Sequence, residues 1–324
     1  MRVVVGERHG GPEVLRIEER ETPRPGPGEV VVDVAAAGVN YMDIYQREGV
    51  GGYRPPLPFV TGGEGAGTVI AVGEGVTGPA VGDQVAWVAP GSYAEQVVLP
   101  ADRVVPVPAG ISTELAAAAI LQGMTAHYLV TSTYPVRAGD VTVVHAAAGG
   151  VGLLLTQMVK RRDGIVVATA SGGEGGEKHR LAREAGADYV AGYDQFRAVL
   201  DEVTGGAGAH VVYDGVGQAT FDDSLAALRP RGMLVIYGAA SGQVPPFDIQ
   251  RLNSGGSLFA TRPTLAHYIA DVEELRWRAR EVFDWIANGE LHVRIGGRYP
   301  LTDAAQAQQD LAARRTTGKL LLVP

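Results

Sequence analysis

A glycine-rich run between an apolar strand and an apolar helix carries the clearest chemical signal in the sequence. Residues 141–145 read Val-Thr-Val-Val-His, and residues 146–152 read Ala-Ala-Ala-Gly-Gly-Val-Gly before an apolar stretch. In this context glycines let the backbone approach a pyrophosphate and let the helix pack closely on the strand. The free N–H groups at the helix N-terminus attract the phosphates. We therefore predict a dinucleotide-binding loop around Gly149 and Gly152, in preference to a glycine-rich turn without a ligand.

The end of the next predicted strand favours a phosphorylated dinucleotide. NAD-preferring sites place an acidic residue about 20 residues past the glycine motif, where it holds the ribose 2′-OH. Here the strand ends Ala-Thr-Ala-Ser at residues 168–171, without a carboxylate. Ser171 and the downstream cation Lys178 are suited to bind a 2′-phosphate. The sequence therefore predicts NADPH rather than NADH, and the alternative is that Lys178 only solvates the start of a helix.

A polar-aromatic group near the N-terminus is a candidate slot for an electron acceptor. It comprises Asn40, Tyr41, Tyr45 and Tyr53. A quinone or an activated enone is already electrophilic, so the protein has to supply mainly positioning, an apolar slot and a polar group or two for the carbonyl oxygen. We predict that Asn40 and Tyr45 orient the nicotinamide and the acceptor, with Tyr53 in the same slot. The alternative is that these tyrosines only pack the β-rich region.

Composition excludes several other chemistries. The chain has no cysteine, which removes disulfides and thiolate-held metals. Its seven histidines are scattered without metal-ligand spacing, and no Gly-x-Ser-x-Gly elbow is present. The net charge of −8 repels nucleic acid and anionic membranes. No secretory signal is visible, so we expect a cytoplasmic protein without a metal, a nucleic-acid partner or a membrane partner.

The pattern of elements predicts two domains. Short β-branched runs alternate with Gly/Pro turns up to about residue 99, which indicates a strand-rich, barrel-like unit. An Ala-rich helix capped by Ser112 follows, and strands then alternate with helices, which indicates a parallel sheet covered on both faces. The predicted strands are 141–145, 165–169, 188–190, 210–213, 232–237 and 257–260, and the predicted helices are 152–162, 177–185, 194–203 and 220–228.

The last sixty residues have no place in such a sheet. We predict for them a long helix over 265–288, a strand at 298–301, a helix over 303–314 and a strand at 319–323. This tail is expected to return to the first domain. The predicted domains are therefore 1–121 with 266–324, and 122–265.

Several separate segments are similar to one known family. Residues 38–45 (GVNYMDIY), 58–67 (PFVTGGEGAG), 122–126 (QGMTA), 213–217 (YDGVG) and 316–319 (TTGK) resemble the zinc-free quinone oxidoreductase branch, which includes zeta-crystallin, of the medium-chain dehydrogenase/reductase superfamily. Val39-Asn40 lies in the region where the zinc enzymes of that superfamily place a cysteine ligand, and Gly63 stands in place of their histidine. The resemblance implies an α/β protein with a GroES-like catalytic domain and a Rossmann domain.

The resemblance also implies which residues contact the cofactor. In this sequence they are Asn40, Thr125, Gly149, Gly150, Val151, Gly152, Ser171, Lys178, Tyr193, Tyr237, Gly238 and Lys319. It implies a homodimer, commonly paired through the Rossmann sheet edge. We expect an NADPH-dependent quinone reductase; the alternatives are an enone or enoyl-thioester reductase and, from another class, a nucleotide-responsive RNA-binding or structural protein. The sequence leaves open the physiological acceptor and whether electrons leave singly or as hydride.

Overall fold

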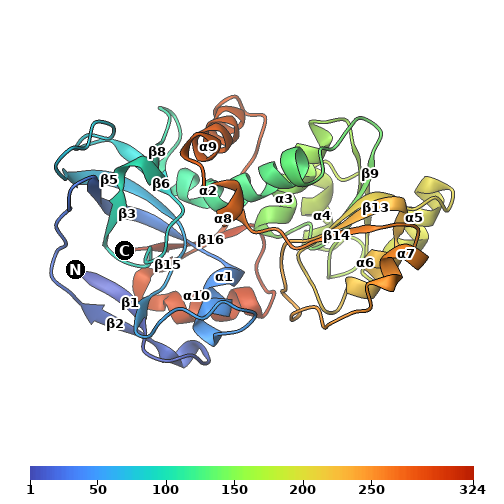
Figure 1. Cartoon of the computed structure of the whole chain (residues 1–324), viewed down its shortest axis with the longest axis horizontal. Helices are drawn as coiled ribbons and strands as arrows, with labels where there is room; N and C mark the ends of the chain where they lie inside the picture. Colours follow the sequence, from blue (N-terminus) through green and yellow to red (C-terminus); the bar gives the residue numbers. More distant parts are fainter. The chain divides into compact units, whose positions relative to one another are not determined.

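The computed structural model describes all residues, 1–324, and divides into two compact units. The first unit comprises Met1–Met124 and Ile269–Pro324, and the second unit comprises Thr125–Tyr268. Both chain termini belong to the first unit, because strands near each end take part in its sheets (Figure 1). No helix is long and apolar enough to cross a lipid bilayer.

The first unit is built on two sheets. A three-stranded sheet has the order β2-β1-β4, and a seven-stranded sheet has the order β15-β16-β3-β5-β6-β8, with β7 paired to β3. The strands are β1 (Arg2–Gly6), β2 (Leu15–Glu19), β3 (Glu29–Val39), β4 (Phe59–Val60), β5 (Gly65–Val72), β6 (Gln84–Trp87), β7 (Gln96–Pro100), β8 (Val104–Pro106), β15 (Ile295–Pro300) and β16 (Lys319–Val323). The C-terminal strand β16 pairs with β3, so the end of the chain is part of this core, as the tail pattern predicts.

The helices of the first unit differ from the sequence prediction at two places. They are α1 (Tyr41–Glu48), most of α2 (Thr113–Tyr128), α9 (Val272–Ala287) and α10 (Ala304–Ala312). The helix α1 was not predicted within the β-rich stretch. The predicted single helix over 265–288 is wrong: it is divided into α8 (Leu265–Tyr268) and α9, because Asp271 caps a new helix by accepting a hydrogen bond from the N–H of Glu274 at 2.9 Å.

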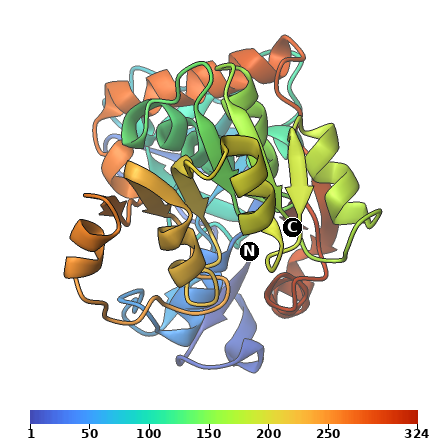
Figure 2. The ribbon, with the colours of Figure 1, turned by 90° about the vertical axis from the view of Figure 1, so that its right-hand side faces the viewer.

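The second unit is a parallel sheet with helices on both faces, which confirms the predicted class (Figure 2). The strands are β9 (Val141–Val144), β10 (Ile165–Thr169), β11 (Tyr189–Ala191), β12 (Ala209–Asp214), β13 (Leu228–Ile236) and β14 (Phe259–Thr261). The helices are α3 (Gly150–Lys160), α4 (Glu177–Glu184), α5 (Phe196–Thr204), α6 (Phe221–Ala226) and α7 (Gln250–Ser254). Apolar β-branched residues fill the central strands because both faces of the sheet are buried.

The strand order identifies the binding edge of the second unit. The order is β11-β10-β9-β12-β13-β14, so the chain reverses direction across the sheet between β9 and β12. Open α/β sheets bind ligands outside the carboxyl ends of the strands at such a switch point. The loops that follow β9, β10 and β12 therefore hold the candidate site of this unit.

Candidate functional site

The loop between β9 and α3 has the geometry of a phosphate cradle. Gly149 is the N-cap of α3 and has no side chain with which to cap the helix. Helix geometry leaves the N–H groups of the first turn, at residues 150–152, without acceptors inside the helix. A Cβ on Gly152 would lie 2.4 Å from the carbonyl oxygen of Ala146 and 2.7 Å from the Cα of Ala147, so only glycine fits there. The residues present therefore suit a pyrophosphate.

The structure brings Ser171 and Lys178 together despite the glycine-rich loop between them. Lys178 Nζ donates to Ser171 Oγ at 3.3 Å, just beyond the carboxyl end of β10. Ser171 is exposed, and Lys178 is half-buried at the start of α4. An ammonium and a hydroxyl at this distance are the donors that a 2′-phosphate requires. The donor set therefore fits NADPH.

The remaining predicted cofactor residues of the second unit are Tyr193, Tyr237, Gly238 and Thr125. The ring of Tyr193 lies 5.8 Å from that of His145, which directly precedes the glycine loop. Gly238 packs so closely on Gly215 that an added Cβ would lie 2.5 Å from the Gly215 carbonyl oxygen. Burial raises the pKa of Tyr237 well above its ordinary value, so its hydroxyl stays protonated. Thr125 is buried in the last turns of α2.

In the first unit the predicted tyrosines form a row along and beyond α1. The ring centroids of Tyr41 and Tyr45 are 6.2 Å apart, and those of Tyr45 and Tyr53 are 5.7 Å apart. Tyr41 donates its hydroxyl to the carbonyl oxygen of Leu311 at 3.0 Å, so it is anchored to the C-terminal segment. The ring of Tyr53 therefore lies beside that of Tyr45, as the predicted slot requires.

The side chain of Asn40 is held by hydrogen bonds within the first unit. Its Nδ2 donates to Glu64 Oε1 at 2.8 Å and to the Gly38 carbonyl at 3.3 Å. Its Oδ1 accepts from Lys319 Nζ at 3.0 Å. Three hydrogen bonds therefore hold the amide. The Asn40 amide is therefore fixed in place within the first unit.

A buried ion pair between Lys319 and Glu64, which the sequence did not predict, is hydrogen-bonded to Asn40. Lys319 Nζ contacts Glu64 Oε1, and the two side chains are 2% and 0% exposed. Lys319 also donates to the Val39 carbonyl at 3.1 Å, while Glu64 Oε2 accepts from the Leu121 N–H at 2.9 Å. Lys319 was predicted among the cofactor contacts, and in the structure its ammonium is bonded to Val39, Asn40 and Glu64 of the first unit. The pair connects β16, the residue before β5, and α2.

A second buried carboxyl group, Asp43, organises the start of α1. Its Oδ2 accepts from the Asn40 N–H and from the Tyr93 hydroxyl, each at 2.8 Å, whereas its Oδ1 has no hydrogen-bond partner. Burial, opposed in part by these hydrogen bonds, raises the pKa of Asp43 to about 7. Asp43 was not among the predicted residues. The spacing Asn-x-x-Asp, typical of a helix N-terminus, is the sequence signal that could have revealed both α1 and this group.

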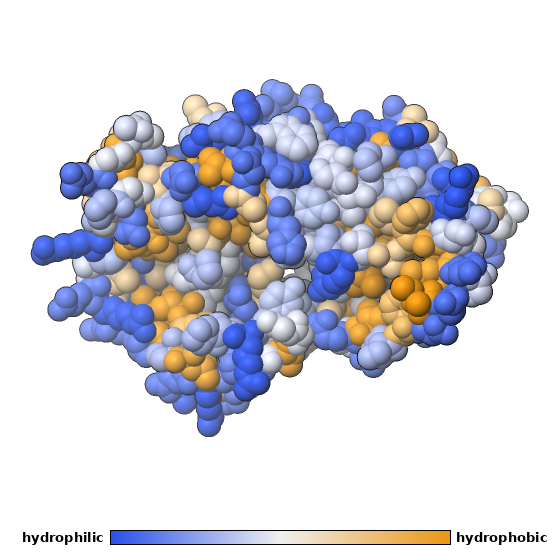
Figure 3. All heavy atoms as spheres, viewed as in Figure 1, coloured by the Kyte–Doolittle hydropathy of each residue, from blue (hydrophilic) through white to orange (hydrophobic).

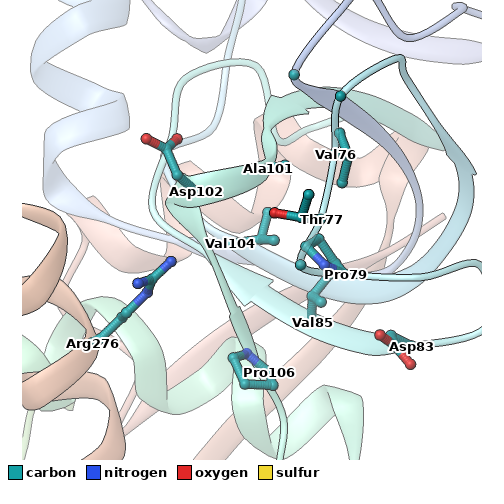
Figure 4. A pocket seen from close by; sticks show the side chains of 13 residues that line it. Val76, Thr77, Pro79, Asp83, Val85, Ala101, Asp102, Val104, Pro106 and Arg276 are labelled. Atoms are coloured by element: carbon teal, nitrogen blue, oxygen red, sulfur yellow. The ribbon is translucent and has the colours of Figure 1, made fainter.

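One cavity of the first unit lies away from these residues. It has a volume of about 580 Å³ and is lined by the loop after β5, by β8 and by Arg276 of α9 (Figure 4). None of the predicted site residues lines it. Two of its charged groups have local partners, since Asp83 accepts from the Ala80 N–H at 2.8 Å and Arg276 pairs with Glu273 at 3.0 Å. The cavity is therefore not part of the candidate site. No three His, Asp or Glu side chains are grouped so as to hold a metal ion.

A β-rich unit completed by the C-terminal strand, joined to a dinucleotide-binding sheet, is the architecture of a medium-chain dehydrogenase/reductase. Two family models agree: "Alcohol dehydrogenase GroES-like domain" matches residues 26–109, and "Zinc-binding dehydrogenase" matches residues 185–322. Among curated proteins, the quinone oxidoreductase of Pseudomonas aeruginosa is 44% identical over 98% of this chain and 97% of its own length. The 2-haloacrylate reductase of a Burkholderia species is 37% identical over 98% and 97%.

Solved structures give the same result. A mycobacterial protein complexed with NADPH is 48% identical with a TM-score of 0.95, and each chain is fully covered. Escherichia coli quinone oxidoreductase complexed with NADPH is 39% identical with a TM-score of 0.96, again over the whole of both chains. The chain belongs to the quinone oxidoreductase family of the medium-chain dehydrogenases/reductases.

Proposed function

We propose that the protein is an NADPH-dependent quinone reductase that works without a metal. The observation that carries the cofactor assignment is the 3.3 Å approach of Lys178 Nζ to Ser171 Oγ at the end of a strand that lacks a carboxylate. Relatives named quinone oxidoreductase, at 44% and 40% identity over nearly the whole chain, support the reaction. The predicted domains, 1–121 with 266–324 and 122–265, supply the acceptor slot and the cofactor site respectively.

The chain's own residues bind and orient rather than react. NADPH supplies the hydride, or single electrons, when it is bound. The glycine loop at 149–152 holds its pyrophosphate, and Ser171 with Lys178 holds its 2′-phosphate. Thr125, Tyr193, Tyr237 and Gly238 are proposed to contact the rest of the cofactor, and Lys319 acts through Asn40.

The acceptor is proposed to lie against the row of tyrosines in the first unit. Tyr45 and Tyr53 provide aromatic faces, and the Tyr45 hydroxyl provides the polar group for the carbonyl oxygen. Asn40, held by hydrogen bonds to Gly38, Glu64 and Lys319, is proposed to orient the nicotinamide. A reduced quinone oxygen is stabilised by conjugation, so no essential acid or base is assigned.

Reduction of an activated alkene is the second candidate function. The relative named 2-haloacrylate reductase supports it, because its printed substrate carries a carbon–carbon double bond next to a carboxyl group. The same cofactor geometry serves both reactions. The alkene reaction needs in addition a proton for the α-carbon, for which Tyr45 or solvent is the proposed donor.

Loss of NADPH absorbance by the purified protein tests the proposal. It is measured with 1,4-benzoquinone, a naphthoquinone, a 2-alkenal and a 2-haloacrylate, each in parallel with NADH. Quinone-dependent oxidation of NADPH that is weak with NADH is the expected result. Turnover only with the alkenes would assign the second function, and the absence of turnover with every acceptor would refute reduction. Tyr45→Phe, compared with Tyr41→Phe, tests the polar group, since Tyr41 is already bonded to Leu311.

We also propose a cytoplasmic homodimer. In support, β14 forms an edge of the parallel sheet, and Phe259 on it is 55% exposed. Hydrophobic atoms also gather on the surface in the region of α6 (Figure 3), and Ile249, before α7, is 68% exposed. Light scattering of the wild type and of Phe259→Lys tests this: a dimer mass that becomes a monomer mass is expected, and a monomeric wild type would refute it.

A further inference from the structure

A buried hydrogen-bonded chain links the three loops that form the carboxyl edge of the second unit. Its centre is His145, which is 0% exposed and directly precedes the glycine loop. His145 Nδ1 lies 2.9 Å from the hydroxyl of Thr169, and Nε2 lies 3.0 Å from the hydroxyl of Ser224. Ser224 in turn donates to Asp214 Oδ2 at 2.7 Å. Residues that end β9, β10 and β12 are thus connected through side chains that are all fully buried.

The hydrogen bonds fix the protonation state of His145. The carboxylate of Asp214 accepts from the N–H groups of Val216 and Gly217 at 2.8 and 2.9 Å, and also from the Thr220 and Ser224 hydroxyls at 2.7 Å. Since Ser224 gives its proton to Asp214, its oxygen can only accept from His145. Nε2 therefore carries the hydrogen, and Nδ1 accepts from Thr169. Burial lowers the pKa of His145, in agreement with this neutral tautomer.

Each end of this chain is continuous with a segment proposed to contact NADPH. Thr169 is two residues before Ser171, which is proposed to bind the 2′-phosphate. His145 adjoins Ala146, whose φ of 53° directs the backbone into the glycine loop. Asp214 fixes the turn on which Gly238 packs. The His145 ring also lies against Tyr193.

We propose that His145 is a positioning residue for the cofactor. Through Thr169 and Ser224 it holds the loops that follow β9, β10 and β12 at fixed positions relative to one another. This inference rests on the proposed NADPH-dependent function. Because all four side chains of the network are 0% exposed, its contribution concerns the spacing between segments. It therefore affects a ligand that spans all three segments more than a ligand that occupies one.

That difference separates positioning from general structural support. NADPH spans the whole edge, whereas 2′,5′-ADP carries only the adenosine end, beside Ser171 and Lys178. Thr169→Val removes one hydroxyl with little change of shape, and Ser224→Ala removes the other. Thr142→Val is the matched control, since its buried hydroxyl bonds only the Ile165 carbonyl at 3.1 Å in the same sheet.

Calorimetry of both ligands with the full chain tests the proposal, with melting temperatures as a check on folding. We expect NADPH to bind about tenfold more weakly to each network variant, the effect of one lost buried hydrogen bond. Binding of 2′,5′-ADP should change by less than about twofold, and Thr142→Val should leave both ligands unaffected.

Three results would overturn the inference. NADPH affinity of both variants within twofold of the wild type would remove any role for the network. Equal weakening of NADPH and 2′,5′-ADP would show only structural support. Wild-type protein that fails to bind NADPH would refute the proposed function itself and this inference with it, an outcome distinct from the other two.

Discussion

Replacing Lys319 by methionine should destabilise the first unit strongly, because it leaves the Glu64 carboxylate buried without its cation. Glu64 is 0% exposed and would keep only hydrogen bonds from Asn40 and Leu121, at 2.8 and 2.9 Å. Breaking a buried ion pair by removing one partner typically costs about 3–5 kcal/mol. Lys319→Met should therefore lower the free energy of unfolding of this unit by about that amount.

The double variant distinguishes a charge effect from lost packing. Glu64→Gln with Lys319→Met removes both charges and keeps an amide near Asn40. Its destabilisation should be smaller than that of Lys319→Met alone, with a coupling energy of about 2 kcal/mol or more between the two positions. Arg298→Met is the control: Arg298 pairs with Glu114 at 2.8 Å, but both side chains are solvent-exposed, so little change is expected.

The assay reads the first unit selectively. All three tryptophans, Trp87, Trp277 and Trp285, belong to that unit, so intrinsic fluorescence during urea unfolding reports it without a signal from the second unit. If Lys319→Met unfolds at the wild-type urea concentration, or if the double variant is no more stable than Lys319→Met, the carboxylate is not the source of the cost and the reasoning is wrong.

Three further results are expected. Burial raises the pKa of Asp43 to about 7, so between pH 3.8 and about 7 the folded unit holds a proton that the unfolded chain has lost. The free energy of unfolding should therefore fall as the pH rises across this range, and urea unfolding of Asp43→Asn should show a weaker dependence on pH. Lys178→Ala should raise the KM for NADPH about tenfold and leave that for NADH unchanged; equal effects on both would remove the 2′-phosphate role. Thr156→Val should stabilise the second unit by about 1 kcal/mol and so raise its melting temperature, because the Thr156 hydroxyl is buried without a partner. A lower melting temperature would show that the hydroxyl is bonded.

The parallel sheet and its glycine loop could be predicted because their signals are local. Buried parallel strands are short apolar runs, the helices between them are long enough to recognise, and the glycine loop directly follows the first strand. Strand β16 was predicted with the observed bounds, Lys319–Val323, because its apolar run is bordered by Gly318 and a terminal proline. Local composition was enough for these elements.

Two predictions of helices were wrong because a capping residue, rather than the local composition, sets where the helix begins. The segment after Val39 lies within a β-rich stretch, and the spacing of Asn40 and Asp43 marks the start of a helix there. Similarly, the apolar and helix-forming residues over 265–288 are continuous, and the break depends on Asp271 accepting from the Glu274 N–H. In both cases a single pair of residues marks the helix N-terminus, and hydrophobic periodicity does not reveal such a pair.

The buried polar groups could not be predicted, because their partners are distant in the sequence. Lys319 and Glu64 are separated by 255 positions, and His145 lies 24 positions from Thr169 and 79 from Ser224. A lone lysine near a chain end is typical of a solvated surface, and a lone histidine after an apolar strand is typical of a core residue. The fold places each beside groups that complete its hydrogen bonds, since an unpaired buried charge or donor would cost more than the fold can sustain. Each group is therefore best interpreted through the segment that its partners hold in place: the segment around Asn40 for Lys319, and the cofactor loops for His145.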